Sequence, residues 1–130
     1  SNDNPVYYIQ YAHARICSVW RQLESAGLAW DQDNGLANTQ QLNHDAEKLL
    51  LVALSKYAEL IVSAAKQYEP HLLANYLQGL ANLFHGYYNA CRFIIDEVAL
   101  RDARLCLVAT VQQVLKNGLG LLGLSAPESM

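Results

Sequence analysis

Apolar residues recur every three or four positions along four long stretches of this chain, which is the period of a helix with one buried face. The first stretch carries a single apolar stripe, made of Ile9, Ala12, Ile16, Val19 and Leu23. Asn4 can cap this stretch, Pro5 suits the first position of a helix, and Gly27 follows the end. The pattern therefore predicts a helix that begins at Pro5 and ends just before Gly27.

Three further helices follow from the same periodicity. The second begins near residues 43–45 and runs through residue 68, and the third begins at Pro70, where Glu69–Pro70 interrupts the chain. The fourth spans residues 100–123. Residues 28–44 are polar, rich in turn formers and aperiodic, so we expect a loop there.

These elements predict an all-α fold, a bundle of about four main helices with one longer loop after the first. Runs of alternating β-branched residues, which would indicate strands, are nearly absent. A length of 130 residues is enough to bury one core, so we expect residues 1–130 to form a single domain. We interpret residues 1–2 as an expression remnant.

The charge of the chain narrows the classes of function. Hydrophobic residues make up 52% and charged residues only 16%, whereas soluble domains usually carry about 25% charged residues. This deficit indicates a surface partly covered by another domain, a subunit or a ligand. The net charge of −3 argues against a general polyanion binder such as a DNA-coating protein. No apolar run approaches the roughly 20 residues of a membrane span.

The cysteines and the opening residues favour a reducing compartment. Cys17, Cys91 and Cys106 are widely spaced and lie among apolar neighbours, which is typical of reduced core thiols. The opening residues contain neither the basic nor the apolar segment of a signal peptide. We therefore expect a cytoplasmic protein.

The glycines near the end of the chain have the spacing of a dinucleotide-binding loop. Gly118, Gly120 and Gly123 match G-x-G-x-x-G, a pattern that binds pyrophosphate where a strand turns into a helix N-terminus. Here the glycines instead follow a long helical stretch, where carbonyl groups point outward and repel phosphate. We interpret them as the close-packed end of the last helix.

Catalytic and metal-binding patterns are weak. His13 and Cys17 stand four residues apart and His85 precedes Cys91 by six, but neither spacing is typical of zinc. The spacing of serine, histidine, cysteine and carboxylate residues supports no nucleophilic site. The residues themselves thus predict no catalytic centre, no metal and no cofactor in this chain.

A second stripe on the first helix is more informative. On a helical wheel of about 100° per residue, Tyr8, Tyr11 and Arg15 fall beside the apolar stripe, and Ser18 and Gln22 continue this second face. Two aromatic rings next to a guanidinium can stack on unpaired bases and hold a phosphate or a base edge. The alternative is that tyrosines at the edge of the bundle bury their rings and leave their hydroxyl groups in water.

Several stretches together resemble the C-terminal anticodon-binding domain of arginyl-tRNA synthetase, an all-helical domain named for its DALR motif. The similar stretches are "NPVYYIQYAHARICSV" at 4–19, "EPHLLANYLQGLANLFHGYYNAC" at 69–91, "ARLCLVATVQQVLKNGLGLLGLSAPESM" at 103–130, and the apolar second helix. The L-G-x-x-A-P-x-x-M ending is especially specific, whereas the DALR residues themselves are replaced by "HLLA" at 71–74.

The resemblance implies a function and a set of site residues. It implies a bundle that docks on the anticodon stem-loop of arginine tRNA, with Tyr8, Tyr11 and Arg15 contacting the loop and Met130 close to it. The family often has a basic residue before that methionine, where this chain has Ser129.

The resemblance also implies a larger class I synthetase. Its HIGH and KMSKS motifs are absent here, so we expect a C-terminal fragment that does not aminoacylate alone. The parent would join arginine to its tRNA with ATP and Mg²⁺, and its catalytic domain would cover one flank of the bundle, with neither DNA nor a membrane as a partner. The alternatives are a helical protein-interaction bundle without an RNA role and a bundle that binds a small molecule or a metal.

Overall fold

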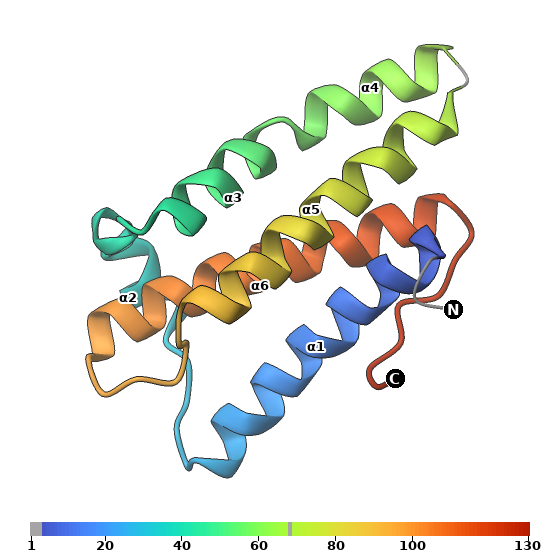
Figure 1. The fold of residues 1–130 in the computed structure, drawn as a ribbon. Coiled ribbons are helices and arrows are strands. Elements are labelled where there is room, and N and C mark those ends of the chain that lie inside the picture. Colours follow the sequence, from blue (N-terminus) through green and yellow to red (C-terminus); the bar gives the residue numbers. More distant parts are fainter. Residues whose placement is uncertain (1–3, 68) are drawn as a thin grey trace.

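A computed structural model describes residues 4–67 and 69–130, and the described residues form helices, turns and loops without a strand (Figure 1). The predicted all-α fold is confirmed. Residues 1–2, interpreted above as an expression remnant, lie outside the described part. The elements are α1 (Pro5–Ser25), α2 (Gln32–Ala37), the 3₁₀ helix η1 (Thr39–Gln41), α3 (Asp45–Ser55), α4 (Tyr57–Gln67), α5 (Pro70–Ala90) and α6 (Val98–Leu121).

Helix α5 is the centre of the bundle. It packs against α1, α3, α4 and α6, and Figure 1 shows it between α1 on one side and the α3–α4 pair on the other. Helix α2 packs on α6. The tail after α6 passes the start of α1 and continues along that helix (Figure 1).

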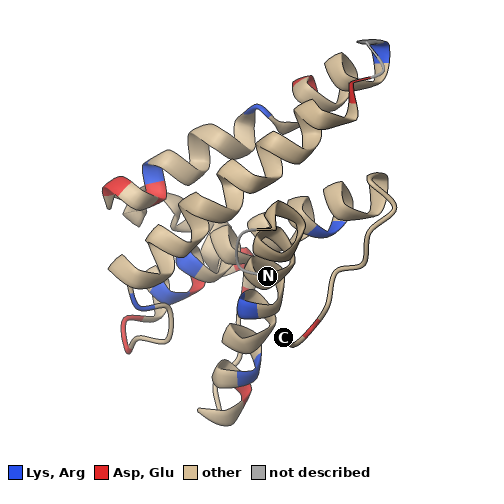
Figure 2. Ribbon diagram, turned by 45° about the vertical axis from the view of Figure 1, so that its right-hand side comes forward, with Lys and Arg blue, Asp and Glu red and all other residues tan. Residues whose placement is uncertain are grey.

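Charged residues are sparse over this bundle. Figure 2 shows short basic and acidic segments scattered along the helices. Within the described residues, none of the helices combines the length and the apolar character needed to cross a membrane.

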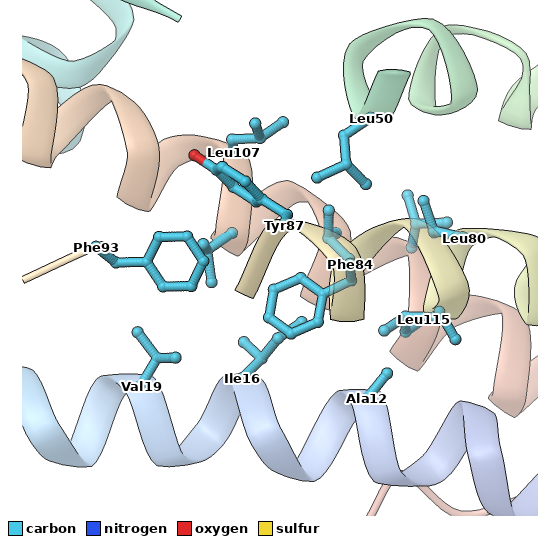
Figure 3. Packing of buried hydrophobic residues seen from close by; sticks show 14 of the residues in the cluster. Ala12, Ile16, Val19, Leu50, Leu80, Phe84, Tyr87, Phe93, Leu107 and Leu115 are labelled. Atoms are coloured by element: carbon cyan, nitrogen blue, oxygen red, sulfur yellow. The ribbon is translucent and has the colours of Figure 1, made fainter. Parts of the chain in front are cut away.

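The predicted start, stripe and end of α1 are confirmed. Asn4 Oδ1 accepts a hydrogen bond from the Val6 N–H at 2.9 Å, and Pro5 takes the first helical position. Gly27 adopts a positive φ of 71° just after the end. The apolar stripe points into the core (Figure 3), where all five members are buried: Ile9, Ala12, Ile16, Val19 and Leu23.

The prediction of a loop over residues 28–44 was wrong in part, because this segment contains α2 and η1. Asp31 caps α2 by accepting the Asn34 N–H at 3.0 Å. Gly35 is buried so tightly against α6 that a Cβ there would collide with the Asp102 carbonyl and the Cys106 sulfur. The short helix therefore forms through contact with α6, which its local sequence pattern does not reveal.

The second predicted helix is divided into α3 and α4 at Lys56. The Ser55 hydroxyl donates to the Val52 carbonyl at 2.6 Å, a local bond of the kind that disturbs helices. Beyond the break, the ring of Tyr57 stacks on that of Tyr76 in α5, with centroids 5.6 Å apart. The two helices together still cover one side of α5.

A carboxylate with no exposed surface joins three helices. Glu47 of α3 accepts the His44 N–H at 3.0 Å, the Tyr87 hydroxyl of α5 at 2.6 Å and Arg104 Nε of α6 at 2.8 Å. Burial, reinforced by the hydrogen bond to Glu47, raises the pKa of Tyr87. Because every partner comes from a different segment, this cluster fixes α3, α5 and α6 relative to one another.

We predict that Glu47→Gln lowers the free energy of unfolding by about 2–3 kcal/mol, because the amide leaves the Arg104 charge unpaired and weakens two bonds. Urea unfolding of both chains measures this difference. The matched control is Glu24→Gln, since Glu24 is exposed on α1. Equal effects of the two substitutions would show that the buried cluster does not stabilise the fold.

We also predict opposite effects for two glycine substitutions. Gly35→Ala should destabilise the chain by about 1–3 kcal/mol, because its methyl group would force α2 away from α6. Gly79→Ala in α5 meets open space and should stabilise by up to about 1 kcal/mol through helix propensity. Thermal unfolding followed by circular dichroism compares the two, and a neutral Gly35→Ala would contradict the close packing.

Candidate nucleic-acid interface

The second stripe of α1 lies at the edge of the bundle, facing α5. Tyr8, Tyr11 and Arg15 are half-buried. The Arg15 guanidinium carbon lies 4.1 Å from the ring centroid of Tyr88 in α5 and 5.3 Å from that of Tyr11. Tyr7 stacks on Tyr11 with centroids 6.3 Å apart. The guanidinium is thus held between aromatic rings of two helices.

A buried histidine lies behind this cluster. His85 of α5 is only 8% exposed, and its Nδ1 lies 3.0 Å from Arg15 Nη1. Its ring centroid is 4.8 Å from that of Tyr8 and 5.4 Å from that of Tyr11. Burial, followed by the nearby Arg15 charge, lowers the pKa of His85 to about 4. The imidazole is therefore neutral at pH 7.

The end of α6 returns the chain to α1. The helix ends at Leu121, Gly123 takes a φ of 74°, and the Leu124 N–H bonds back to the Leu119 carbonyl at 2.8 Å. The interpretation of G-x-G-x-x-G as a helix end is confirmed. Gly118 is also packed closely, because a Cβ there would meet the Leu77 side chain.

Side chains of α1 bind the returning tail through its backbone carbonyl groups. Gln10 Nε2 donates to the Ser125 carbonyl at 3.0 Å, and the His13 ring donates from Nδ1 to the Pro127 carbonyl at 2.9 Å. Arg21 Nη1 donates to the Glu128 carbonyl at 3.0 Å. The tail therefore has a defined path along α1, and its last residues lie beside the aromatic cluster.

The tail and the two helices enclose a shallow groove with a volume of about 260 Å³. Its lining combines aromatic, cationic and small side chains: Tyr11, Ala14, Arg15, Ser18, Arg21, Tyr88, Ser129 and Met130. The Met130 side chain is 53% exposed. An aromatic wall, two guanidinium groups and a thioether can hold a flat, polar-edged ligand such as a nucleic-acid base.

The structure brings three of the four predicted site residues together, since Tyr11, Arg15 and Met130 line this groove. Tyr8 lies beside it and contacts His85 instead. Sequence reasoning missed Tyr88 and His85 as members of the cluster. Their signal is present in "FHGYYNAC", where aromatic residues follow the buried face of α5 at helical spacing.

Potential metal ligands and thiols are dispersed among the described residues. Among the described residues, no three histidine, cysteine, aspartate or glutamate side chains are grouped to hold a metal. Cys17, Cys91 and Cys106 are free thiols, and burial raises the pKa of each. The groove therefore offers aromatic and guanidinium groups rather than metal ligands.

Comparison with known proteins agrees with the geometry. The family model "DALR anticodon binding domain" matches residues 9–130. Arginine–tRNA ligases are similar over all 130 residues, with 59% identity in Coxiella burnetii (strain RSA 331 / Henzerling II) and 58% in Legionella pneumophila (strain Corby). The alignment covers 100% of this chain and 22% of each ligase.

A solved structure shows the same fold. Arginyl-tRNA synthetase of Thermus thermophilus matches with a TM-score of 0.82 and 35% identity, over 100% of this chain and 22% of that one. The chain thus spans about a fifth of the length of the relatives it matches. Sequence and fold both match over the length of the chain, and the chain belongs to the DALR anticodon-binding domain family.

Proposed function

We propose that this chain is the anticodon-loop recognition domain of an arginine–tRNA ligase and that the groove between α1, α5 and the tail is its RNA site. The observation that carries this proposal is the convergence of Tyr11, Arg15, Tyr88 and Met130 on one open groove. These side chains come from α1, α5 and the tail. Neither the packing of the core nor the edge of a bundle requires them to meet at one place.

The groups suit an unpaired base. A base extruded from the anticodon loop can stack on an aromatic ring, which contributes about 1–3 kcal/mol per base. Arg15 uses one of its N–H groups on His85, and a guanidinium has five. The remaining donors can hold a base edge or a phosphate.

The low charge of the chain supports a site that recognises RNA by the placement of a few side chains rather than by general attraction to phosphates. With a net charge of −3, general attraction to phosphates is weak. Arg15 and Arg21 are the cations that line the groove. Affinity then depends on placing these few groups correctly, which is consistent with a tail held by several hydrogen bonds.

The rest of the ligase would supply the chemistry. We infer that a catalytic domain outside this chain joins arginine to its tRNA in the cytoplasm, using ATP and Mg²⁺. Exposed apolar side chains on α3 and α4 offer it a flank to cover: Leu49, Leu51, Val52 and Val62. A helical interaction bundle without an RNA role is the alternative that these same residues leave open.

We predict that Tyr11→Ala and Arg15→Ala in the intact ligase each weaken arginine-tRNA binding by about 1–3 kcal/mol, because each removes one wall of the groove. Filter binding measures the affinities, with an anticodon-altered tRNA for comparison. The matched control is Lys56→Ala, since Lys56 is an exposed cation between α3 and α4. If both groove variants bind like the unchanged protein, the site assignment is wrong, and equal binding of the two tRNAs would favour the interaction bundle.

We further predict that Ser129→Lys strengthens tRNA binding, because it adds a cation to the lining of the groove. The slope of log affinity against log salt should become steeper by about 1, as for one additional phosphate contact. Ser129→Gln, which adds length without charge, should leave the slope unchanged. A slope unaffected by lysine would place the RNA backbone away from the tail.

A further inference from the structure

His85 forms a side-chain hydrogen bond to a cation, and the Tyr8 backbone also acts on the same ring. Nδ1 lies 3.0 Å from Arg15 Nη1, whereas Nε2 is buried and has no hydrogen-bond partner. A buried ring nitrogen without a partner is costly, and such groups call for an explanation beyond packing.

The hydrogen bond determines the tautomer of the ring. A guanidinium can only donate, so Nδ1 must accept and carry no proton. A neutral imidazole has one N–H, which then lies on Nε2, the atom without a partner. The hydrogen bond to Arg15 thus fixes Nδ1 as the acceptor and leaves the proton of the ring on Nε2.

A neutral acceptor has a specific advantage at an RNA site. Within the described residues, the salt bridge is that of Arg104 with Glu47, and Arg15 takes part in none. A carboxylate in the place of His85 would orient Arg15 equally well but would cancel its charge. An imidazole orients the guanidinium and leaves its positive charge available to a phosphate or a base edge.

We propose that His85 is a positioning residue for RNA binding, which as its neutral Nε2–H tautomer holds the Arg15 guanidinium in the groove without neutralising it. The inference rests on the proposed function. The surroundings support it: Arg15, Tyr8 and Tyr11 face the ring from α1, and Phe84 flanks it on α5. The low pKa of His85 keeps this acceptor neutral under physiological conditions.

Two substitutions of nearly equal shape separate orientation from packing. In His85→Asn, the side-chain oxygen can occupy the place of Nδ1 and accept from Arg15, whereas His85→Leu has the same branching without an acceptor. In the intact ligase, we expect His85→Leu to weaken arginine-tRNA binding about 10-fold, the value of a hydrogen bond to a charged group. His85→Asn should restore most of this loss.

Kinetics and stability give independent readouts. We expect His85→Leu to raise the KM for tRNA while kcat and the KM values for arginine and ATP stay unchanged. Its Tm should fall by no more than about 4 °C, because leucine has nearly the shape of the imidazole and keeps the packing of the site. In an Arg15→Ala background, His85→Leu should have no further effect on affinity.

Nuclear magnetic resonance of this chain tests the tautomer without relying on mutants. Long-range ¹⁵N–¹H spectra at pH 7 should show His85 protonated on Nε2 and not on Nδ1. A proton on Nδ1, a charged ring at pH 7, or equal affinities of the leucine and asparagine variants would overturn the proposal. If Arg15→Ala binds tRNA normally, the proposed RNA site fails. If Arg15→Ala weakens binding but His85→Leu does not, only this inference fails.

Discussion

The arrangement of the whole site depends on one buried carboxylate. Glu47 receives three hydrogen bonds, from the start of its own helix, from Tyr87 of α5 and from Arg104 of α6. The anchored Tyr87 fixes the rotation of α5 about its axis. Its neighbour Tyr88 then points about 100° away around the helix, toward α1 and the guanidinium of Arg15.

The same cluster also fixes the connection after α5. Arg104 Nη1 donates to the Arg92 carbonyl at 2.8 Å, and the next residue, Phe93, is buried against the rings of Phe84, Tyr87 and Tyr88. The half-buried ring of Tyr88, which lines the groove, is thus supported by the buried ring of Phe93. The position of the groove follows from packing on the far side of α5.

The three faces of helix α1 make different contacts. Its apolar stripe builds the core, and its aromatic face lines the groove. Its third face, with Gln10, His13 and Arg21, binds the tail through backbone carbonyls. Apart from a 3.4 Å contact between Gln10 Nε2 and the Ser125 hydroxyl, these bonds involve backbone atoms of the tail, so its path depends little on its side chains.

Features set by local sequence could be predicted, whereas features set by contacts between helices could not. The α1 stripe, its caps and the break at Pro70 are local features, and each was predicted correctly. Helix α2 was missed because six residues with Gly35 become helical only against α6. His85 and Tyr88 were missed as site residues because their roles come from contacts with α1. The path of the tail came from the family resemblance, since no local pattern in residues 124–130 specifies it.

Because the chain carries little charge, the orientation of the few arginine side chains should matter most for binding at the proposed site. A strongly basic domain can tolerate a misplaced arginine, because its general field still attracts phosphate. This chain has a net charge of −3, so in the proposed site each guanidinium would have to act at a defined position. Aromatic rings confine Arg15 on two sides, and the neutral His85 fixes it from a third. Packing against two rings and one hydrogen bond to a neutral acceptor thus hold a single positive charge at a defined place in the groove.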